Sequence, residues 1–221
     1  MLHILTSHFS RTSLTAQVVA LLVVFSVSSE LWADKAVAQS AADTCPIQVG
    51  ETLPSLSLPG LDGKSHDVKR LVAQKPTIMI FYRGGWCPYC NTQLGELKTI
   101  EKQILDRGYQ VLAISPDLPK NLKKSVSQHR LNFTLLSDSK AEFAKALGLA
   151  FRVDEKTNKK LLKHNINLEA ASGEKHRILP VPAAIVLNTQ GGVEFVFTSP
   201  NYKVRVDKNV LLAAAKAAMK N

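Results

Sequence analysis

Continuous apolar runs alternate along the chain with segments in which apolar residues recur at helical spacing. The runs that are long enough for buried strands occupy residues 77–82, 109–114 and 133–136. Helical spacing follows each of them, in the segments 88–107, 115–129 and 139–147. Because strands and helices alternate, the pattern predicts a parallel sheet with right-handed crossovers in an α/β fold.

The segments on either side of this repeat have other patterns. Residues 53–58 alternate between apolar and polar before a glycine-rich turn, which indicates an edge hairpin. Residues 183–187 and 193–198 flank a turn with two glycines and predict a second hairpin. An Ala- and Leu-rich segment at 210–219 predicts a closing helix.

Residues 150–180 are polar and interrupt the repeat. Within them we expect a helix at 155–163 and a loop at 169–175. The hairpin strands turn the parallel sheet into a mixed one. The sequence therefore predicts a central mixed sheet flanked by helices, with an N-terminal extension and with an insertion before the strand that follows Pro182.

The N-terminal residues have the features of a secretory leader. Leu14–Val27 is almost wholly apolar, and it is too short to span a bilayer. Ala36-Val37-Ala38 offers an A-x-A cleavage site, and a cut after Ala33 is the alternative. Only Arg11 is basic in the stretch before the apolar run, so an uncleaved membrane anchor stays a second interpretation.

These features divide the chain into three parts. We expect a signal peptide at 1–38, a linker at 39–46 and one domain at 47–221. The expected location is outside the cytoplasm, in a bacterial periplasm, and no stable membrane span is expected once the leader is removed.

Composition narrows the classes of partner. The chain has 221 residues, of which 45% are hydrophobic and 21% charged, as in globular domains. Its net charge is +10, but the lysines are spread along predicted helices and loops, without aromatic interleaving. We therefore expect no nucleic-acid binding, and only a weak attraction to anionic surfaces or acidic partners.

The candidate chemistry lies in Cys87-Pro88-Tyr89-Cys90. The motif follows a predicted buried strand, and Pro88 stands where a helix can begin. A spacing of three residues places both sulfurs on one helix face, close enough for a disulfide. The helix N-terminus favours a thiolate, so Cys87 is the expected nucleophile and Cys90 the resolving thiol.

A C-x-x-C pair also occurs in zinc sites and in structural disulfides. Half of a zinc site would need further ligands, and Cys45 is the only other cysteine. An inert structural disulfide suits an oxidising compartment. The context of strand, Gly-Gly-Trp and helix favours redox catalysis, and we expect no catalytic role for Cys45.

The chain resembles a known family at five motifs. Trp86-Cys-Pro-Tyr-Cys90 resembles the thioredoxin signature. Peroxiredoxin-like members of the alkyl hydroperoxide reductase/thiol-specific antioxidant (AhpC/TSA) family are similar at 81–91, 112–117, 135–139, 179–183 and 199–205. This resemblance, over residues 47–221, implies a thioredoxin fold. It also implies that Val181-Pro182 is the cis-proline that faces the active cysteines in that fold.

The chain departs from the peroxiredoxin pattern P-x-x-x-T-x-x-C. Ile80 stands in place of the proline, and Gly84 in place of the threonine. Pro182 occupies the position of the family's arginine. Those groups stabilise the charge that develops on a peroxide. Arg83 or Arg205 can supply a substitute cation, although either arginine can equally be a surface residue paired with a carboxylate.

Two further residues are candidates for support of the cysteines. Trp86 is expected to shield the sulfurs, or else to form a docking surface. His176 lies in the loop before Pro182 with Glu174 and Arg177, and that loop faces the redox pair in the thioredoxin fold. His176 is thus a candidate proton shuttle, with a solvated loop histidine as the simpler interpretation.

Three functions are consistent with the sequence. The resemblance favours an antioxidant peroxidase that acts on peroxides; the intact C-x-x-C favours a thiol–disulfide oxidoreductase acting on protein disulfides. A copper- or heme-maturation accessory that binds metal through the pair is a more remote hypothesis. No cofactor is expected; a thioredoxin-like protein would donate electrons, and a homodimer is left open.

Overall fold

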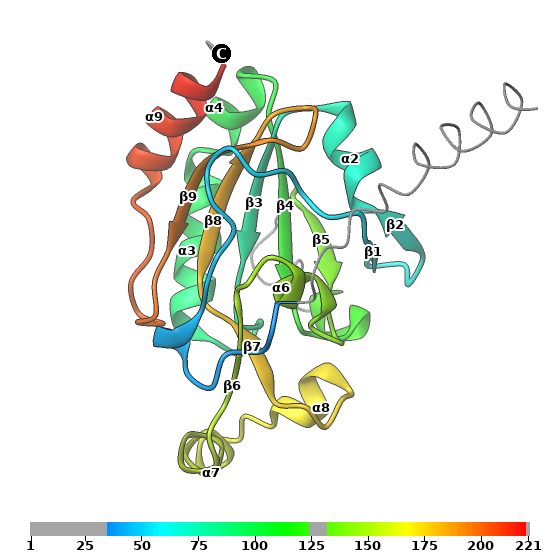
Figure 1. Ribbon diagram of the computed structural model, residues 1–221, viewed down its shortest axis with the longest axis vertical. Helices are drawn as coiled ribbons and strands as arrows, with labels where there is room; N and C mark the ends of the chain where they lie inside the picture. The colour runs from blue at the N-terminus through cyan, green and yellow to red at the C-terminus, as the bar shows by residue number, and fades with distance from the viewer. Residues whose placement is uncertain (1–34, 124–131, 220–221) are drawn as a thin grey trace, which may run out of the picture. The chain divides into compact units, whose positions relative to one another are not determined.

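The computed structural model describes residues 35–123 and 132–219 of the chain (Figure 1). Most of the predicted leader and residues 124–129 of the helix predicted at 115–129 lie outside these ranges. Within them, no helix is long and apolar enough to cross a membrane.

A five-stranded mixed sheet forms the centre of the domain (Figure 1). In spatial order its strands are β5 (Thr134–Ser137), β4 (Gln110–Ser115), β3 (Thr77–Phe81), β8 (Ala183–Leu187) and β9 (Val193–Thr198). The pairs β3–β4 and β4–β5 are parallel, whereas β3–β8 and β8–β9 are antiparallel. The predicted strands, the mixed sheet and the second hairpin are therefore confirmed.

Helices cover both faces of this sheet (Figure 1). The covering helices are α2 (Val68–Gln74) and α6 (Glu142–Ala146) on one face, and α3 (Pro88–Thr99), α4 (Glu101–Asp106) and α9 (Lys208–Ala218) on the other. All five residues of β3 are buried. Met79 and Phe81 pack toward α2 and α6, while Ile78 and Ile80 pack toward α3 and α9. This two-sided burial explains why β3 is a continuous apolar run.

The helix predicted at 88–107 is two helices. Ile100 ends α3 with φ −110° and ψ 5°, and α4 begins at the next residue. Gly108 then adopts φ +78° and leads into β4. The predicted edge hairpin is formed by β1 (Ser57–Pro59) and β2 (Ser65–Asp67).

The insertion at 150–180 is more regular than expected. Its elements are β6 (Ala150–Arg152), α7 (Glu155–Lys163), α8 (Leu168–Ser172) and β7 (Ile178–Pro180). Strands β6 and β7 pair with each other in a separate two-stranded sheet. The loop predicted at 169–175 was partly wrong, because Asn167 caps α8 by accepting the amide N–H of Ala170 at 3.0 Å.

The expected cis-proline is also wrong. None of the described peptide bonds is cis, so the bond between Val181 and Pro182 is trans. Both residues lie in the connection between β7 and β8. The Val181 N–H donates to the Leu149 carbonyl at 2.9 Å, and the Pro182 carbonyl accepts from the Ser199 N–H at 3.2 Å. The trans peptide bond is compatible with both of these hydrogen bonds, and a proline by itself does not require the cis isomer.

The segment before residue 47 is part of the fold. Ala38 pairs with β6: its N–H donates to the Ala150 carbonyl at 3.1 Å, and its carbonyl accepts from the Arg152 N–H at 2.9 Å. A short 3-10 helix, η1 (Ala41–Asp43), follows. Val37 and Ala41 pack against the apolar cluster on the α2 side of the sheet.

Gly148 leaves the space that the backbone of this segment occupies at Cys45, and its replacement tests this close approach. Its φ is +66°, and a Cβ at this position would lie 1.8 Å from the Cys45 carbonyl oxygen. We expect Gly148→Ala to lower the free energy of unfolding by at least about 2 kcal/mol, measured by urea denaturation. Gly95→Ala, in α3 with open space around it, should instead raise stability by up to about 1 kcal/mol. Equal effects of the two substitutions would contradict the role of Gly148.

Candidate active site

The two cysteines of the C-x-x-C motif lie at the N-terminus of α3. Cys87 is the N-cap residue, Pro88 is the first helical residue, and Cys90 lies in the first turn. The Cys87 carbonyl accepts the N–H groups of Cys90 and Asn91, both at 3.1 Å. Both thiols are free, and they are 1% and 0% exposed. The nucleophile is thus held at a helix N-terminus and shielded from water.

The surroundings of Cys87 favour its ionised form. They lower the pKa of Cys87 to about 6, chiefly through the hydrogen bond from the Cys90 thiol. Burial acts in the opposite direction. The backbone N–H of Cys90 and the charges of Arg83 and Arg205 lower the pKa further. Cys87 is therefore a thiolate at neutral pH.

Cys90 has the opposite character. Its hydrogen bond to Cys87 and its burial raise the pKa of Cys90 well above the usual range of a thiol. Arg205 opposes this shift, because its Nη2 donates to Cys90 Sγ at 3.4 Å. The pair therefore holds one negative charge, on Cys87, and one proton, on Cys90.

Arg83 lies between two aromatic rings just after β3. Its Cζ is 5.0 Å from the centroid of Trp86 and 4.5 Å from that of Tyr202. The side chain is 6% exposed. Among the described residues, none forms a hydrogen bond or an ion pair with its guanidinium, so its charge is free to act on Cys87 or on a ligand.

The turn before Cys87 requires glycine. Gly84 adopts φ +143°, and a Cβ there would lie 2.3 Å from Trp86 Nε1 and 2.9 Å from Asp117 Oδ1. The threonine of the peroxiredoxin pattern therefore does not fit at this position. The indole of Trp86 and the carboxylate of Asp117 occupy the space that its side chain would need.

Asp117 anchors this turn from the end of β4. Its Oδ2 accepts the Gly85 N–H at 2.7 Å, and its carbonyl accepts the Ser137 hydroxyl at 2.7 Å. Burial raises the pKa of Asp117 to about 6, against the lowering effect of the Gly85 N–H. The carboxylate is thus ionised at neutral pH, when it accepts the hydrogen bond that positions the turn.

Buried polar atoms without a partner gather around the cysteines. Among the described residues the full set is Tyr82 Oη, Arg83 Nε, Asn91 Oδ1, Gln93 Oε1 and Arg205 Nε. Four of the five residues lie within 82–93, and the fifth contacts Cys90. Buried polar groups are normally paired in native proteins. Of these residues, Arg83 and Arg205 act on Cys87, so their unpaired Nε atoms mark where a polar ligand would be accommodated.

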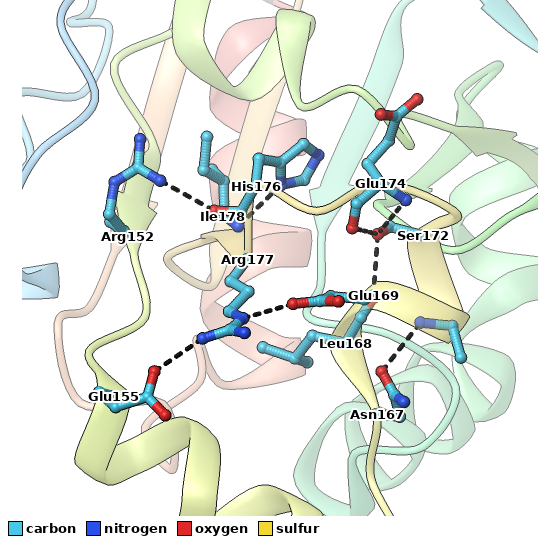
Figure 2. Close-up of polar contacts among 11 residues, drawn as sticks. Arg152, Glu155, Asn167, Leu168, Glu169, Ser172, Glu174, His176, Arg177 and Ile178 are labelled. Atoms are coloured by element: carbon cyan, nitrogen blue, oxygen red, sulfur yellow. Dashed lines mark hydrogen bonds and ion pairs between the residues drawn. The ribbon is translucent and has the colours of Figure 1, made fainter.

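His176 is engaged elsewhere. Figure 2 shows its ring beside Ile178, whose N–H donates to Nδ1 at 2.9 Å, while Nε2 lies 2.8 Å from the Ser139 carbonyl. The neutral tautomer with a proton on Nε2 satisfies both contacts. These bonds hold the loop before β7, and a proton shuttle would have to break one of them.

The neighbours of His176 in the insertion also have structural contacts (Figure 2). Arg177 adopts φ +51° and joins α7 to α8, since it donates to Glu155 at 2.7 Å and to Glu169 at 2.6 Å. The Glu174 N–H donates to the Ser172 hydroxyl at 3.2 Å. The loop is therefore held by its own polar contacts.

Pro182 and Cys45 were also considered from the sequence, and their surroundings differ. Pro182 lines a cavity together with Arg83 and Tyr202. Cys45 is exposed, and its carbonyl accepts from Lys35 Nζ at 3.4 Å. Within residues 35–123 and 132–219, no three or more His, Cys, Asp or Glu side chains gather as a metal site would require.

Asp117 and Tyr202 were missed as site residues by the sequence reasoning. Both lie in motifs that carry the family resemblance, Leu112–Asp117 and Ser199–Arg205, but neither was given a role. Their partners are distant in sequence: 32 residues separate Gly85 from Asp117. Only the assembled sheet brings them to the start of α3.

The model of the AhpC/TSA family matches residues 49–196 of the chain, which include both motif cysteines and Asp117. The chain belongs to the AhpC/TSA family. Peroxiredoxin Bcp of Escherichia coli (strain K12) is 31% identical over 104 residues. That alignment covers 47% of this chain and 66% of the relative, just under two thirds of its length.

Solved structures show the same fold. Reduced Prx3 of Vibrio vulnificus, in complex with hydrogen peroxide, is similar with a TM-score of 0.64 and 20% identity, over 79% of this chain and 99% of that one. Peroxidoxin BcpB of Mycobacterium tuberculosis has a TM-score of 0.60 and 18% identity, over 77% and 97%. The predicted family resemblance and fold class are therefore confirmed.

A pH titration tests which neighbour stabilises the Cys87 thiolate. In a Cys45→Ser background, the ultraviolet absorbance of the thiolate should titrate with a midpoint near 6. Cys90→Ala removes the main donor and should raise the midpoint by about one to two pH units. Cys90→Ser keeps a donor and should raise it less.

Replacement of Arg83 should shift the titration midpoint of Cys87 as well, but by a smaller amount. Arg83→Gln should raise the midpoint by less than Cys90→Ala does, because the charge of Arg83 ranks below the hydrogen bonds of Cys90 among the causes. Arg83→Lys keeps the charge and serves as the control. A larger rise with Arg83→Gln than with Cys90→Ala would show that this ranking is wrong.

Proposed function

We propose that the protein is a thiol peroxidase of the peroxiredoxin kind that reduces peroxides through Cys87 and Cys90. The observation that carries the proposal is the buried Cys87 thiolate at the N-terminus of α3, next to two cationic side chains. Family membership and the names of the relatives support the same activity.

The proposed reaction has two steps. The Cys87 thiolate attacks one peroxide oxygen, the O–O bond breaks, and the leaving oxygen takes up a proton to become water or an alcohol. Cys87 is left as a sulfenic acid. The Cys90 sulfur then attacks Cys87 Sγ, a disulfide forms and water leaves. A dithiol donor, of the thioredoxin-like class, returns two electrons to the disulfide.

The first step prepares Cys90 for the second. The hydrogen bond and the charge of the Cys87 thiolate are among the main reasons for the raised pKa of Cys90. Both disappear when Cys87 becomes a neutral sulfenic acid. Arg205 Nη2, 3.4 Å from Cys90 Sγ, then stabilises the Cys90 thiolate. The resolving thiol is thus activated only after the peroxide has reacted.

Two cations replace the groups missing from the peroxiredoxin pattern. Gly84 excludes a threonine, and Pro182 stands where the family pattern has arginine. Arg83 and Arg205 lie close enough to lower the pKa of Cys87, and each has a buried Nε without a described partner. In the proposal their guanidinium groups stabilise the negative charge on the breaking O–O bond.

Stopped-flow oxidation of the reduced protein by hydrogen peroxide tests the activity. Trp86, next to Cys87, reports the reaction by its fluorescence. We expect oxidation at least about 100-fold faster than that of an ordinary free thiol. Cys87→Ser should abolish the phase, and Cys90→Ser should keep it and accumulate a sulfenic acid that dimedone traps.

A second function, thiol–disulfide exchange, is favoured by the intact C-x-x-C at a helix N-terminus. The same samples separate the two functions when a disulfide substrate replaces the peroxide. Peroxide oxidation no faster than that of free cysteine, beside rapid Cys87-dependent disulfide exchange, would refute the peroxidase and establish the oxidoreductase.

We also propose that the chain is exported and that its leader is cut after Ala33. The hydrogen bonds of Ala38 with Ala150 and Arg152 support this choice of site. A cut after Ala38 would remove Ala38 from β6, and it would also remove Val37 from the apolar cluster.

Expression in a bacterium with a periplasm tests this proposal. We expect the intact mass of the periplasmic protein to correspond to a chain that begins at Asp34. A chain that begins at Gln39 would refute the cleavage site. Uncleaved protein in the membrane fraction would instead support the membrane anchor.

A further inference from the structure

A cavity of about 260 Å³ opens beside Arg83. It lies between the segment 39–41, the insertion at 151–157 and the connections around Pro182 and Tyr202. An engineered protein cavity of about 150 Å³ binds benzene. The cavity is therefore large enough for a substituted benzene or a branched alkyl group.

Most of the cavity wall is apolar. The apolar side chains that line it are Ala41, Phe151, Val153, Val181, Pro182 and Pro200. Phe151 and Ala41 are partly buried, and Val181 is 1% exposed, so this wall is part of the packed domain. Such a lining favours the hydrocarbon part of a ligand.

The charged groups of the cavity favour an anion. Arg83 is 6% exposed, its Nε is buried, and none of the described residues is its partner. Arg152 donates from Nη1 to the His176 carbonyl at 3.1 Å, and neither arginine forms an ion pair with a described carboxylate. Two guanidinium groups therefore line one largely apolar cavity, and neither is paired with a described carboxylate.

Asp154 is the described carboxylate that lines the cavity, and it is the N-cap residue of α7. Its two oxygens accept the N–H and the hydroxyl of Thr157, at 2.8 and 2.6 Å, and these bonds lower the pKa of Asp154. Asp154 keeps its negative charge and further acceptor sites. Among the described residues no ion pair joins it to Arg83 or Arg152, so both guanidinium groups remain available to a ligand.

Arg83 connects the cavity to the chemistry. Its charge lowers the pKa of Cys87, and its side chain lines the cavity. Arg152 lines the same cavity from β6. A molecule that places one polar end at Arg83 and the other at Arg152 would hold its apolar body against the wall described above.

We infer that this cavity binds organic hydroperoxides that carry a carboxylate, with the carboxylate at Arg152 and the peroxide group at Arg83. The inference rests on the proposed peroxidase activity and adds its substrate class. Gln39, Ser40 and Ala41 lie before the region that the family matches, and Pro200 and Tyr202 lie after it. Part of the cavity is therefore built by residues outside the matched region.

Kinetics with matched peroxides test the substrate class. We compare kcat/KM of the reduced full-length protein for cumene hydroperoxide and for its para-carboxylate, each relative to hydrogen peroxide. The wild type should prefer the carboxylate by about fivefold, the effect of one exposed charge-assisted contact. Arg152→Gln should abolish the preference, and Arg152→Glu should reverse it. The control Arg70→Gln, an exposed arginine on α2 outside the cavity, should preserve it.

Binding without turnover is measured separately, by calorimetric titration with 4-isopropylbenzoate and its neutral amide. The benzoate should bind more tightly than the amide to the wild type, and equally to Arg152→Gln. Peroxide reduction without a carboxylate preference or benzoate binding would overturn the cavity proposal and leave the peroxidase. Arg152-dependent benzoate binding, without reduction of any peroxide, would overturn the peroxidase and the substrate role, and leave a carboxylate site.

Discussion

A thiolate that is almost completely removed from water must be stabilised by its neighbours. Burial alone raises the pKa of a thiol, so the ionisation of Cys87 depends on groups that donate hydrogen bonds or carry positive charge. Cys90, in the first turn of α3, donates the hydrogen bonds, and Arg83 and Arg205 carry the positive charge. The remaining features of the site follow from the need to hold these groups in place.

That need explains why the site draws on the whole sheet. Arg83 follows β3, the middle strand of the sheet, and Arg205 lies between β9 and α9. Asp117, at the end of β4, holds the turn at Gly85. The parallel pairing of β3 with β4 brings the ends of these strands together, so the sheet register fixes the position of the turn relative to its carboxylate.

The sequence was sufficient for what is decided locally. The apolar run of β3, the turn glycines and Pro88 at the start of α3 each have a local signal, and each led to the observed element. Long-range contacts have no such signal, because Cys90 and Arg205 are 115 positions apart in the sequence and meet only in the folded chain. Helix α8 was missed because five residues contain too little periodicity to distinguish a helix from a loop.

The departures from the family pattern, too, can be interpreted only from contacts that form in the folded chain. A missing threonine appears in the sequence as a loss of peroxide-binding groups, yet in the structure Trp86 fills the space beside Gly84. The ring of Trp86 also stacks against Arg83. The substitution therefore exchanges a hydroxyl for an aromatic contact that holds a buried cation next to Cys87. Because the guanidinium is held by ring faces rather than by a carboxylate, its charge is not neutralised, and it remains available both to the thiolate and to a bound anion.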